Sequence, residues 1–576
     1  MVAVTPRRLA DGGARLAGRA PGRQTRVVPF DRADALRRLT DEAFDVLVIG
    51  GGITGAGVAL DAASRGLRTA LVERRDLASG TSSKSSKLVH GGLRYLQQRD
   101  FRLVYEALHE RQRLRKTAPH LVHLLPFLMP MFGKGGLVHP KLVKALSSAL
   151  WMYDLTGGAR IGKLHERISA EEVLAHMPTL RRDRVVGGFV YYDARTDDAR
   201  LTLAVARTAA DHGAAIATWT EVTGLRKEDG RVVGATVQPR GGDPIDIRAT
   251  VVVNAAGVWS DTIRAIDEGA DPDSIRPAKG VHVTVPWEKV RNDIAAVVPV
   301  PKDRRSVFVV PSADRSHTYV GTTDTDYDGP IDDPVCTAED VTYLLDAMNA
   351  SLTEPLTTDD VLGTWAGLRP LVKSASSART ADLSRRHLVA RSDSGVLSVM
   401  GGKLTTYRRM ASDAVDAVVK IVGKGGRSRT ARLPLHGADG YAALTTAGSA
   451  ARLAVDQVTL DHLAGRYGGD ARIVAAMVAA DPDLGRPLIE GLPHLRAEAV
   501  YAARYELAQT LDDVLSRRIP ARWLAAEASA AAAEDAARLV APELGWSDAD
   551  VEREVAEYRA AVDAERDAAG LRTVPA

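Results

Sequence analysis

The chain contains a single cysteine, Cys336, among its 576 residues. One cysteine cannot form an intrachain disulfide, and it excludes a thiolate metal cluster or the cysteine pair that attaches haem. A reducing cytoplasm fits this composition. We predict that Cys336 is a passive small side chain and that the protein has no metal site.

The chain also lacks an excess of either charge and any long hydrophobic run. Lys and Arg total 76 against 73 Asp and Glu, so the formal net charge is only +3. This balance gives no electrostatic reason to expect nucleic acid as a partner. No stretch approaches the roughly 20 apolar residues that span a bilayer. Residues 121–132 come closest, but Pro126 and Pro130 interrupt them.

The first 43 residues are rich in Arg, Ala and Gly and lack the apolar run of a secretory signal. Residues 1–30 are nearly free of acidic side chains, as in a mitochondrial-type presequence. However, Gly12, Gly13 and Pro21 would interrupt the amphipathic helix that such a presequence needs. We predict that residues 1–43 form a basic, disordered extension.

Strands and helices alternate in the first three-quarters of the chain. The pattern predicts a strand at Asp45–Ile49, a helix at Thr54–Arg65 and a strand at Thr69–Glu73, and fully apolar runs such as VLVI suit a parallel sheet covered on both faces. Further predicted strands are Val185–Tyr192, Ala215–Thr218, Thr250–Asn254, Val281–Val285, Val307–Val310, Thr318–Gly321 and Gly395–Met400. After Leu433, Ala-rich helical periodicity dominates, for example at 497–515 and 521–540.

A glycine-rich loop follows the first predicted strand. Gly50, Gly52 and Gly55 form G-x-G-x-x-G, and Ile53 and Thr54 begin the helix. The first glycine makes the tight turn, the second lets the backbone approach a pyrophosphate, and the third lets helix and strand pack closely. The helix N-terminus offers free N–H groups to phosphates.

An acidic residue completes this pattern. Glu73 ends the next strand 21 residues after Gly52, where its carboxylate can accept hydrogen bonds from a ribose diol. The unit predicts a dinucleotide site, but by itself it does not distinguish NAD from FAD.

The loop at 80–95 is rich in hydroxyl groups and could wrap the second half of an extended cofactor. We predict that it contacts the cofactor through Thr81, Ser82, Ser86, Lys87 and Leu88.

At this point the chain resembles the FAD-dependent glycerol-3-phosphate dehydrogenases, which have the D-amino-acid-oxidase-like flavoprotein fold. The matching blocks run in family order from about residue 44 to 518. They are the glycine loop, TSSKSSKLVHGGLRYL at 81–96, DDARL at 197–201, NAAGVW at 254–259, KGVH at 279–282, GTTD at 321–324, GLRP at 367–370, SRRH at 384–387, GGKLTTYR at 401–408 and YELAQTLDDVLSRR at 505–518.

The resemblance implies an α/β fold with three parts. A Rossmann-like FAD-binding domain is expected over 44–130, 190–260 and 360–425. An interleaved α+β substrate-binding domain is expected over 131–189 and 261–359, and an all-α cap domain over 430–576. Asp512, Asp513, Arg517 and Arg518 in the cap are expected to form a salt-bridged helix surface rather than a site.

The implied reaction is the oxidation of sn-glycerol 3-phosphate to dihydroxyacetone phosphate by hydride transfer from C2 to FAD, in glycerol and glycerophospholipid catabolism. The substrate phosphate needs cationic partners, and Arg is preferred because its fork matches phosphate oxygens. By resemblance, Arg94, Tyr95, Arg369, Arg385 and Lys403 line the substrate site, with Arg369 and Arg385 mainly on the phosphate. The sequence departs from the family beside Arg385, where Arg386 stands in place of the usual acidic residue.

The proton acceptor has several candidates. His90 suits the role of general base because an unperturbed histidine has a pKa near 6.5. A histidine that only packs beneath the flavin is an equal alternative for His90. His282 and Asp324 are further candidates for the base and for substrate contact. The catalytic set that we predict is His90, Arg369 and Lys403.

Two further segments are expected to contact the cofactor. The turn that contains Gly402, Lys403 and Leu404 resembles the second flavin contact of the family, near the N1–C2=O edge. Gly257 lies in a run of small residues at the end of an apolar strand, which can lie against the cofactor.

The electron acceptor implied by the resemblance is membrane quinone, reached from the inner face of a bacterial cell membrane without spanning it. Residues 137–153 could form a surface helix, with Leu142, Val143, Leu146, Leu150 and Tyr153 at helical spacing and Lys134, Lys141 and Lys144 for anionic lipid heads. A buried core helix is the more common alternative for such a pattern. The expected partners are therefore glycerol 3-phosphate, quinone, the membrane surface and a second copy of the chain.

Three other functions remain open from the sequence. One is an oxidase that passes electrons to O₂ and forms peroxide. Another is a non-catalytic flavin-binding protein, which the Arg369, Lys403 and His90 blocks argue against. The last is an NAD-dependent dehydrogenase that uses the same glycine loop.

Overall fold

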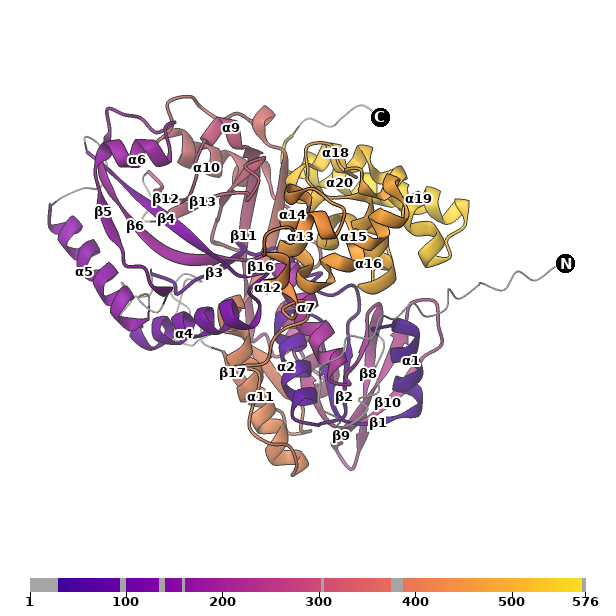
Figure 1. Cartoon of the computed structure of the whole chain (residues 1–576). Coiled ribbons are helices and arrows are strands. Elements are labelled where there is room, and N and C mark those ends of the chain that lie inside the picture. The colour runs from indigo at the N-terminus through magenta and orange to yellow at the C-terminus, as the bar shows by residue number, and fades with distance from the viewer. Residues whose placement is uncertain are drawn as a thin grey trace.

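A computed structural model describes residues 30–93, 100–133, 140–157, 161–301, 305–373 and 387–571. Within these ranges two β-sheets of 8 and 10 strands lie beside a group of C-terminal helices (Figure 1). None of the helices in the described ranges is long and apolar enough to cross a membrane.

The first sheet contains the glycine loop. Its main path runs β17-β18-β10-β1-β2-β7, with β1 parallel to both β10 and β2, and a β8–β9 hairpin continues from β10. The strands are β1 (Ala43–Ile49), β2 (Thr69–Val72), β7 (Ala215–Ala217), β8 (Thr220–Glu228), β9 (Arg231–Pro239), β10 (Ile245–Asn254), β17 (Leu388–Arg391) and β18 (Leu397–Met400).

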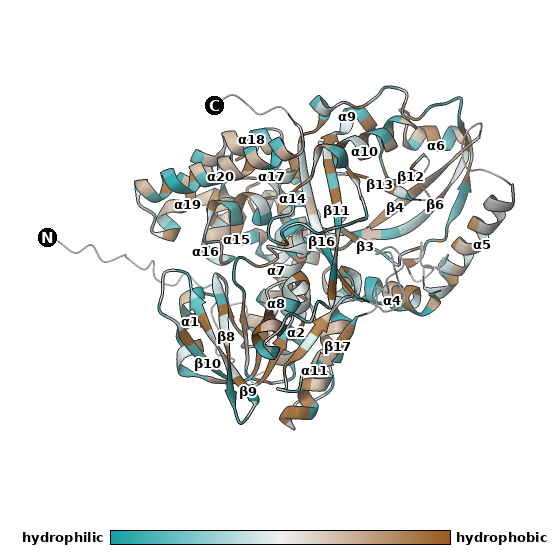
Figure 2. Ribbon diagram, turned by 180° about the vertical axis from the view of Figure 1, so that it is seen from behind, coloured by the Kyte–Doolittle hydropathy of each residue, from teal (hydrophilic) through white to brown (hydrophobic). Residues whose placement is uncertain are grey.

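Alternate residues of β1 bury against opposite layers. Val46 and Val48 join the core beneath α2 (Ile53–Ser64), α7 (Asp198–Asp211) and α11 (Tyr407–Val422). Leu47 and Ile49 join a second core with α1 (Arg32–Asp41) and the β8–β9 hairpin. Figure 2 shows the resulting concentration of hydrophobic residues where α2, α11 and the strands meet. Both faces of the sheet are covered, as predicted for an apolar parallel sheet.

The second sheet has 10 strands. Its path is β15-β11-β14-β13-β12-β4-β6-β3, with β16 paired to β11 and β5 paired to β6. The strands are β3 (Leu88–Val89), β4 (His123–Phe132), β5 (Glu166–Ile168), β6 (Val185–Arg195), β11 (Ile275–Pro286), β12 (Ala295–Pro299), β13 (Ser306–Pro311), β14 (His317–Gly321), β15 (Thr325–Asp326) and β16 (Gly363–Val372).

Helices cover both faces of this sheet as well. Side chains from α6 (Ala170–His176) and α10 (Ala338–Asn349) share one core with β11, β12 and β13. On the other face, α4 (Phe101–Thr117) and α5 (Pro140–Thr156) pack over β4 and β6. The short helix α9 (Trp287–Val290) contacts β11 and β14, whereas α8 (Ser260–Glu268) packs against β8 of the first sheet.

The C-terminal part is helical, as predicted. Its helices are α12 (Tyr441–Leu444), α13 (Ser449–Arg452), α14 (Gln457–Tyr467), α15 (Ala471–Ala480), α16 (Arg496–Tyr505), the π-helix η9 (Asp513–Arg518), α17 (Ala521–Leu524), α18 (Ala526–Ala531), α19 (Ala533–Leu544) and α20 (Asp548–Ala568). The long helices expected at 497–515 and 521–540 are each divided into shorter segments.

Several expectations need correction. Residues 32–41, placed in a disordered extension, form α1, which is capped by Asp31 and buries Ala35 and Leu39 one turn apart. The glycines and prolines that disfavour a helix lie before residue 23, and residues 1–29 lie outside the described ranges. The expected domain ranges stay a prediction, although β4 and β16 pair into the second sheet rather than the first.

The pair Arg517 and Arg518 does not lie on a helix surface. Both arginines are buried and contact Asp76, which follows β2 in the first sheet. The distances are 2.6 Å from Arg517 Nε to Asp76 Oδ2 and 2.7 Å from Arg518 Nη2 to Asp76 Oδ1. The cluster therefore joins the C-terminal helices to the nucleotide-binding sheet.

Candidate active site

A cavity of about 450 Å³ lies where the two sheets meet. Its lining includes the glycine loop at 50–54, the end of β2 at 72–75, residues 79–90, residues 255–259, parts of β11 and β16, and the turn at 401–405. Of the predicted cofactor residues, it is lined by Gly50, Gly52, Ile53, Thr54, Glu73, Thr81, Ser82, Ser86, Leu88, Gly257, Gly402, Lys403 and Leu404.

The glycines of the loop have distinct steric roles. Gly50 has φ +108°, and a Cβ there would lie 2.8 Å from the Ala255 carbonyl oxygen. A Cβ at Gly55 would collide with the Gly50 carbonyl, so this glycine permits the close contact of helix and strand. At Gly52 a Cβ would meet only the Ser82 hydroxyl, 3.2 Å away, and this position faces the cavity. The loop therefore fits the backbone approach that a pyrophosphate requires.

The polar groups beside the loop complete a dinucleotide cradle. The N-terminus of α2 has no side-chain cap at Gly52, and the Ile53 N–H donates to Ser82 Oγ at 2.9 Å. The Glu73 carboxylate accepts from the N–H groups of Gly51 at 2.6 Å and Arg75 at 2.9 Å. These bonds hold a carboxylate at the end of β2 in the cavity wall, where a ribose diol would bind. Burial raises the pKa of Glu73.

The hydroxyl-rich loop is held by an aspartate that the sequence reading did not assign. The fully buried Asp198, at the start of α7, accepts from the Ser85 N–H at 2.9 Å and the Ser85 hydroxyl at 2.7 Å. It also accepts from Lys87 Nζ at 2.7 Å. Lys87 therefore helps to hold the loop through Asp198. It does not line the cavity, although it was expected to contact the cofactor. The DDARL block was the available signal for Asp198.

The turn after β18 requires its two glycines. Gly401 and Gly402 have φ +72° and +85°, and a Cβ at Gly402 would collide with the Met410 sulfur. Lys403 follows and is the N-cap residue of a short helix, η6 (Leu404–Thr406), that leads into α11. The turn thus brings a lysine and a helix start to the cavity.

His90 lines the cavity from the loop after β3. Its backbone bonds to Thr405 in both directions: the His90 N–H donates to Thr405 Oγ1 at 3.2 Å, and that hydroxyl donates to the His90 carbonyl at 3.3 Å. The imidazole lies edge-on to Phe308, with ring centroids 6.2 Å apart. Thr405 therefore links the His90 backbone to the turn that contains Lys403. Its residue type alone did not indicate this role.

Arg369 lines the cavity from β16. Its guanidinium donates to Asp324 Oδ1 at 3.1 Å, Thr322 Oγ1 at 3.2 Å and the Thr323 carbonyl at 3.1 Å. A side chain at Gly280 on the neighbouring strand would occupy its place. Asp324 does not line the cavity and instead orients the arginine.

His282 also lines the cavity but is held in a stack. Its ring lies 4.7 Å from Trp365 at an interplanar angle of 9°, and its Nε2 is 2.9 Å from Ser86 Oγ. Burial, with the nearby Arg369 and Lys87 charges, places the pKa of His282 well below its usual value. The imidazole is therefore neutral at physiological pH and a weak proton acceptor.

Three cationic residues that the sequence did not single out also line the cavity: Arg74, Arg75 and Lys84. Burial lowers the pKa of the Lys84 ammonium group. A bound anion would offset that desolvation. Three predicted substrate residues, Arg94, Tyr95 and Arg385, lie outside the described residues.

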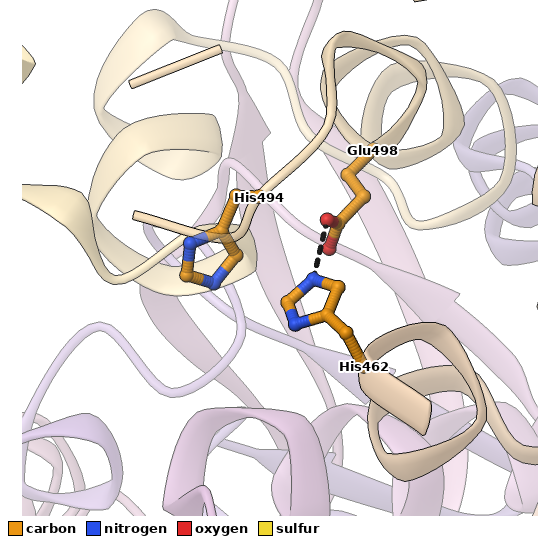
Figure 3. Close-up of side chains that lie close together, drawn as sticks. All are labelled: His462, His494 and Glu498. Carbon is orange, nitrogen blue, oxygen red and sulfur yellow. Dashed lines mark hydrogen bonds and ion pairs between the residues drawn. The ribbon is translucent and has the colours of Figure 1, made fainter. Parts of the chain in front are cut away.

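A second group of polar side chains lies in the C-terminal helices. His462, His494 and Glu498 place potential ligand atoms within 4.8 Å of one another (Figure 3). However, Glu498 already accepts from the Leu495 N–H at 2.8 Å, the Tyr467 hydroxyl at 2.8 Å and His462 Nε2 at 2.7 Å. The Arg466 guanidinium lies 3.3 Å from the same carboxylate and disfavours an added cation. The geometry is that of a buried ion-pair cluster that links α14 to α16.

Two protein-family models match most of the chain. Residues 45–408 match the model described as FAD dependent oxidoreductase, and residues 428–551 match the C-terminal domain of alpha-glycerophosphate oxidase. The fold, the dinucleotide cradle and these matches define an FAD-dependent oxidoreductase.

Individual relatives identify the family within this class of oxidoreductases. The chain is 44% identical to glycerol-3-phosphate dehydrogenase 2 of Mycobacterium tuberculosis over 542 residues, which are 93% of this chain and 91% of that one. It is 37% identical to the human mitochondrial glycerol-3-phosphate dehydrogenase over 544 residues, or 91% of this chain and 74% of that one. The crystal structure of the Bacillus halodurans glycerol-3-phosphate dehydrogenase complexed with FAD superposes with a TM-score of 0.76 at 32% identity, covering 94% of this chain and 99% of that one. The chain belongs to the FAD-dependent glycerol-3-phosphate dehydrogenase family.

Proposed function

We propose that the protein oxidises sn-glycerol 3-phosphate to dihydroxyacetone phosphate and passes the electrons to membrane quinone. The observation that supports this most directly is that His90, Arg369 and the Lys403 turn line one cavity together with the dinucleotide cradle. FAD, when bound in that cradle, supplies the hydride acceptor for C2. The remaining tasks, which are phosphate binding, orientation and proton removal, fall to the side chains of the chain.

Arg369 is our assignment for the substrate phosphate. A guanidinium binds phosphate oxygens through two parallel N–H donors, and its contacts with Asp324 and Thr322 set its plane before the substrate arrives. Lys403 lies in the same wall and adds positive charge where negative charge gathers during reduction. Arg94 and Arg385 remain proposed partners of the phosphate by resemblance.

His90 is our assignment for the general base that removes the proton of the C2 hydroxyl. Both alternatives are weaker on physical grounds. The depressed pKa of His282 makes it a poor proton acceptor, and Asp324 is paired with Arg369 outside the cavity wall. His90 has a backbone anchored to the Lys403 turn, which sets its ring relative to the other reacting groups.

An anaerobic reaction with substrate tests the proposal. Adding glycerol 3-phosphate to the purified yellow holoenzyme without oxygen should bleach the flavin absorbance. Tightly bound FAD that is not bleached would refute the substrate assignment.

A second measurement separates the two acceptors. Reoxidation of the reduced enzyme is followed with a soluble quinone analogue and, separately, with O₂ while peroxide is measured. We expect fast reoxidation by quinone and little peroxide. Stoichiometric peroxide at a rate that matches substrate oxidation would establish the oxidase instead.

We also propose peripheral contact with the inner face of the cell membrane, through α5. This helix has two apolar faces. Leu150 and Tyr153 are buried against the second sheet, whereas Trp151, Met152 and Leu155 are 49%, 37% and 80% exposed. An exposed apolar face on a helix with lysines near its start suits the interfacial region of a bilayer.

A further inference from the structure

Besides Thr405, a network of three buried polar side chains holds the loop that carries His90. They come from three elements: Arg111 from α4, Tyr153 from α5 and Asp193 from β6. Each of the three has a relative exposure of 2% or less. Tyr153 and Asp193 contact the backbone at Gly91, one residue after His90, and Arg111 contacts Asp193.

The Gly91 N–H and the three side chains form one hydrogen-bonded network. The Gly91 N–H lies 3.0 Å from the Tyr153 hydroxyl and 3.1 Å from Asp193 Oδ1. The Tyr153 hydroxyl lies 2.7 Å and 2.6 Å from the two oxygens of Asp193. Arg111 Nη1 donates to Asp193 Oδ1 at 2.5 Å and to the Tyr192 carbonyl at 2.8 Å. Burial beside Asp193 raises the pKa of Tyr153 far above its usual value, so the phenol stays protonated.

The absence of a side chain at residue 91 lets this set reach the backbone. A Cβ at Gly91 would lie 2.5 Å from the Tyr153 hydroxyl and 2.5 Å from Leu108 Cδ2. The same stretch of β6 also pairs with β3 just before the loop, where Val89 is opposite Ala194. The backbone around His90 is therefore fixed both by β6 and by Thr405.

The network carries a larger desolvation penalty than is needed to satisfy one backbone N–H. A single carbonyl oxygen would satisfy that donor, whereas a buried carboxylate, guanidinium and phenol each carry a desolvation penalty. In return, the charged groups provide short, directional hydrogen bonds that restrict the position of the loop. Small displacements of a catalytic group reduce rates strongly, so such definition matters next to a reacting side chain.

We propose that Tyr153 and Asp193 are positioning residues for the oxidation: they fix the backbone at Gly91 and thereby place the His90 imidazole in the cavity. The proposal rests on the proposed function, in which His90 takes the substrate proton. Neither residue lines the cavity, so both act through His90 rather than on the substrate.

The test compares two buried tyrosines in the holoenzyme. Tyr153→Phe removes the hydroxyl at Gly91, and Tyr558→Phe removes an equally buried hydroxyl in α20 that lies 2.9 Å from Ser529 Oγ. We expect Tyr153→Phe to lower kcat by about tenfold or more, with FAD content retained and the KM for glycerol 3-phosphate changed less than about threefold. Its pH–rate profile should also shift, whereas Tyr558→Phe should keep the wild-type kcat and profile. Equal kcat and pH profiles in Tyr153→Phe and wild type would overturn the proposal.

A double variant tests whether Tyr153 acts through His90. If it does, Tyr153→Phe should slow the wild type but should not slow His90→Asn further. Multiplied losses in the double variant would show that Tyr153 acts independently, and would also overturn the proposal. Wild-type turnover with glycerol 3-phosphate is the separate check on the proposed function. Should Tyr153→Phe fail to fold, Gly91→Ala disturbs the same contact from the backbone, because its Cβ would meet the Tyr153 hydroxyl. It is expected to give the same kcat loss, and full activity in that variant would count against the proposal.

Discussion

The backbone of His90 and the hydroxyl of Thr405 form hydrogen bonds with each other in both directions, at 3.2 and 3.3 Å. The two residues are 315 positions apart in the chain. This contact joins the loop that presents the proposed base to the turn that presents Lys403. Two parts of the proposed reaction site are therefore linked by hydrogen bonds.

Replacing His90 by Asn should slow the reaction without loss of FAD. We expect kcat to fall by about 10²–10⁴-fold, because a positioned general base contributes that much to proton removal. The limb of the pH–rate profile that belongs to the base should disappear. Steady-state kinetics over a range of pH measure both effects. His176→Asn, a surface histidine bonded to Asp293, serves as the control. An unchanged rate and profile in His90→Asn would remove His90 from the base role.

Replacing Arg369 by Lys should weaken substrate binding although the charge is kept. Lysine cannot reproduce the fork that contacts Asp324 and Thr322 and that we assign to the phosphate. We expect the KM for glycerol 3-phosphate to rise by about tenfold or more. The matched control is Arg264→Lys on α8, where the arginine bonds to Glu268 on the surface. A KM equal to that of the wild type would show that Arg369 does not bind the phosphate.

Replacing Asp76 by Asn should destabilise the protein. The change leaves Arg517 and Arg518 buried with less compensating charge, and breaking a buried ion pair costs about 3–5 kcal/mol. Denaturant unfolding monitored by flavin release and by circular dichroism measures the loss. As control, Arg538→Ala breaks the exposed pair with Glu534 and should leave the unfolding midpoint unchanged. Similar midpoints for the two variants would mean that the Asp76 cluster does not hold the helical domain in place.

His436 should make stability depend on pH. Burial alone would lower the pKa of His436, but hydrogen bonds to Asp211 and Asp470, both at 2.9 Å, outweigh it and raise the pKa. A group with a raised folded-state pKa stabilises the fold fully below its unfolded pKa, near 6.5, and this contribution is lost as pH rises through the folded value. His436→Gln should therefore lower Tm at about pH 6 more than at about pH 8.5. Thermal unfolding at both pH values is the measurement, and an equal Tm loss at both would contradict the assignment.

Removing the exposed apolar face of α5 should weaken membrane contact. We expect Trp151→Ser with Leu155→Ser to reduce co-sedimentation with anionic vesicles, because both side chains would be buried in the bilayer interface. Activity with a soluble quinone analogue should be retained. Val458→Ser, at a 77% exposed valine on α14, is the matched control. Undiminished vesicle binding by the α5 variant would reject the membrane role of this helix.

The sequence alone was sufficient where the determinants are local. The glycine loop, the strand before it and Glu73 lie within about 30 residues, and their spacing encodes a turn, a helix start and a strand end that the structure contains. The paired glycines at 401 and 402 are a similar case, because their positive φ values need residues without a Cβ. The helical C-terminal part followed from composition and periodicity.

Only the tertiary structure decided which side chains serve these segments. Asp198 holds the 85–87 loop from 113 positions away, and Asp76 pairs with arginines 441 and 442 positions away. No periodicity links such partners, because they meet only when the two sheets and the helical part pack together. The same holds for His282 and Lys87, whose residue types suit a reaction site but whose neighbours, Trp365 and Asp198, give them structural contacts. The sequence by itself determined where the cofactor cradle is, and packing determined which polar groups face the cavity and which ones hold its walls.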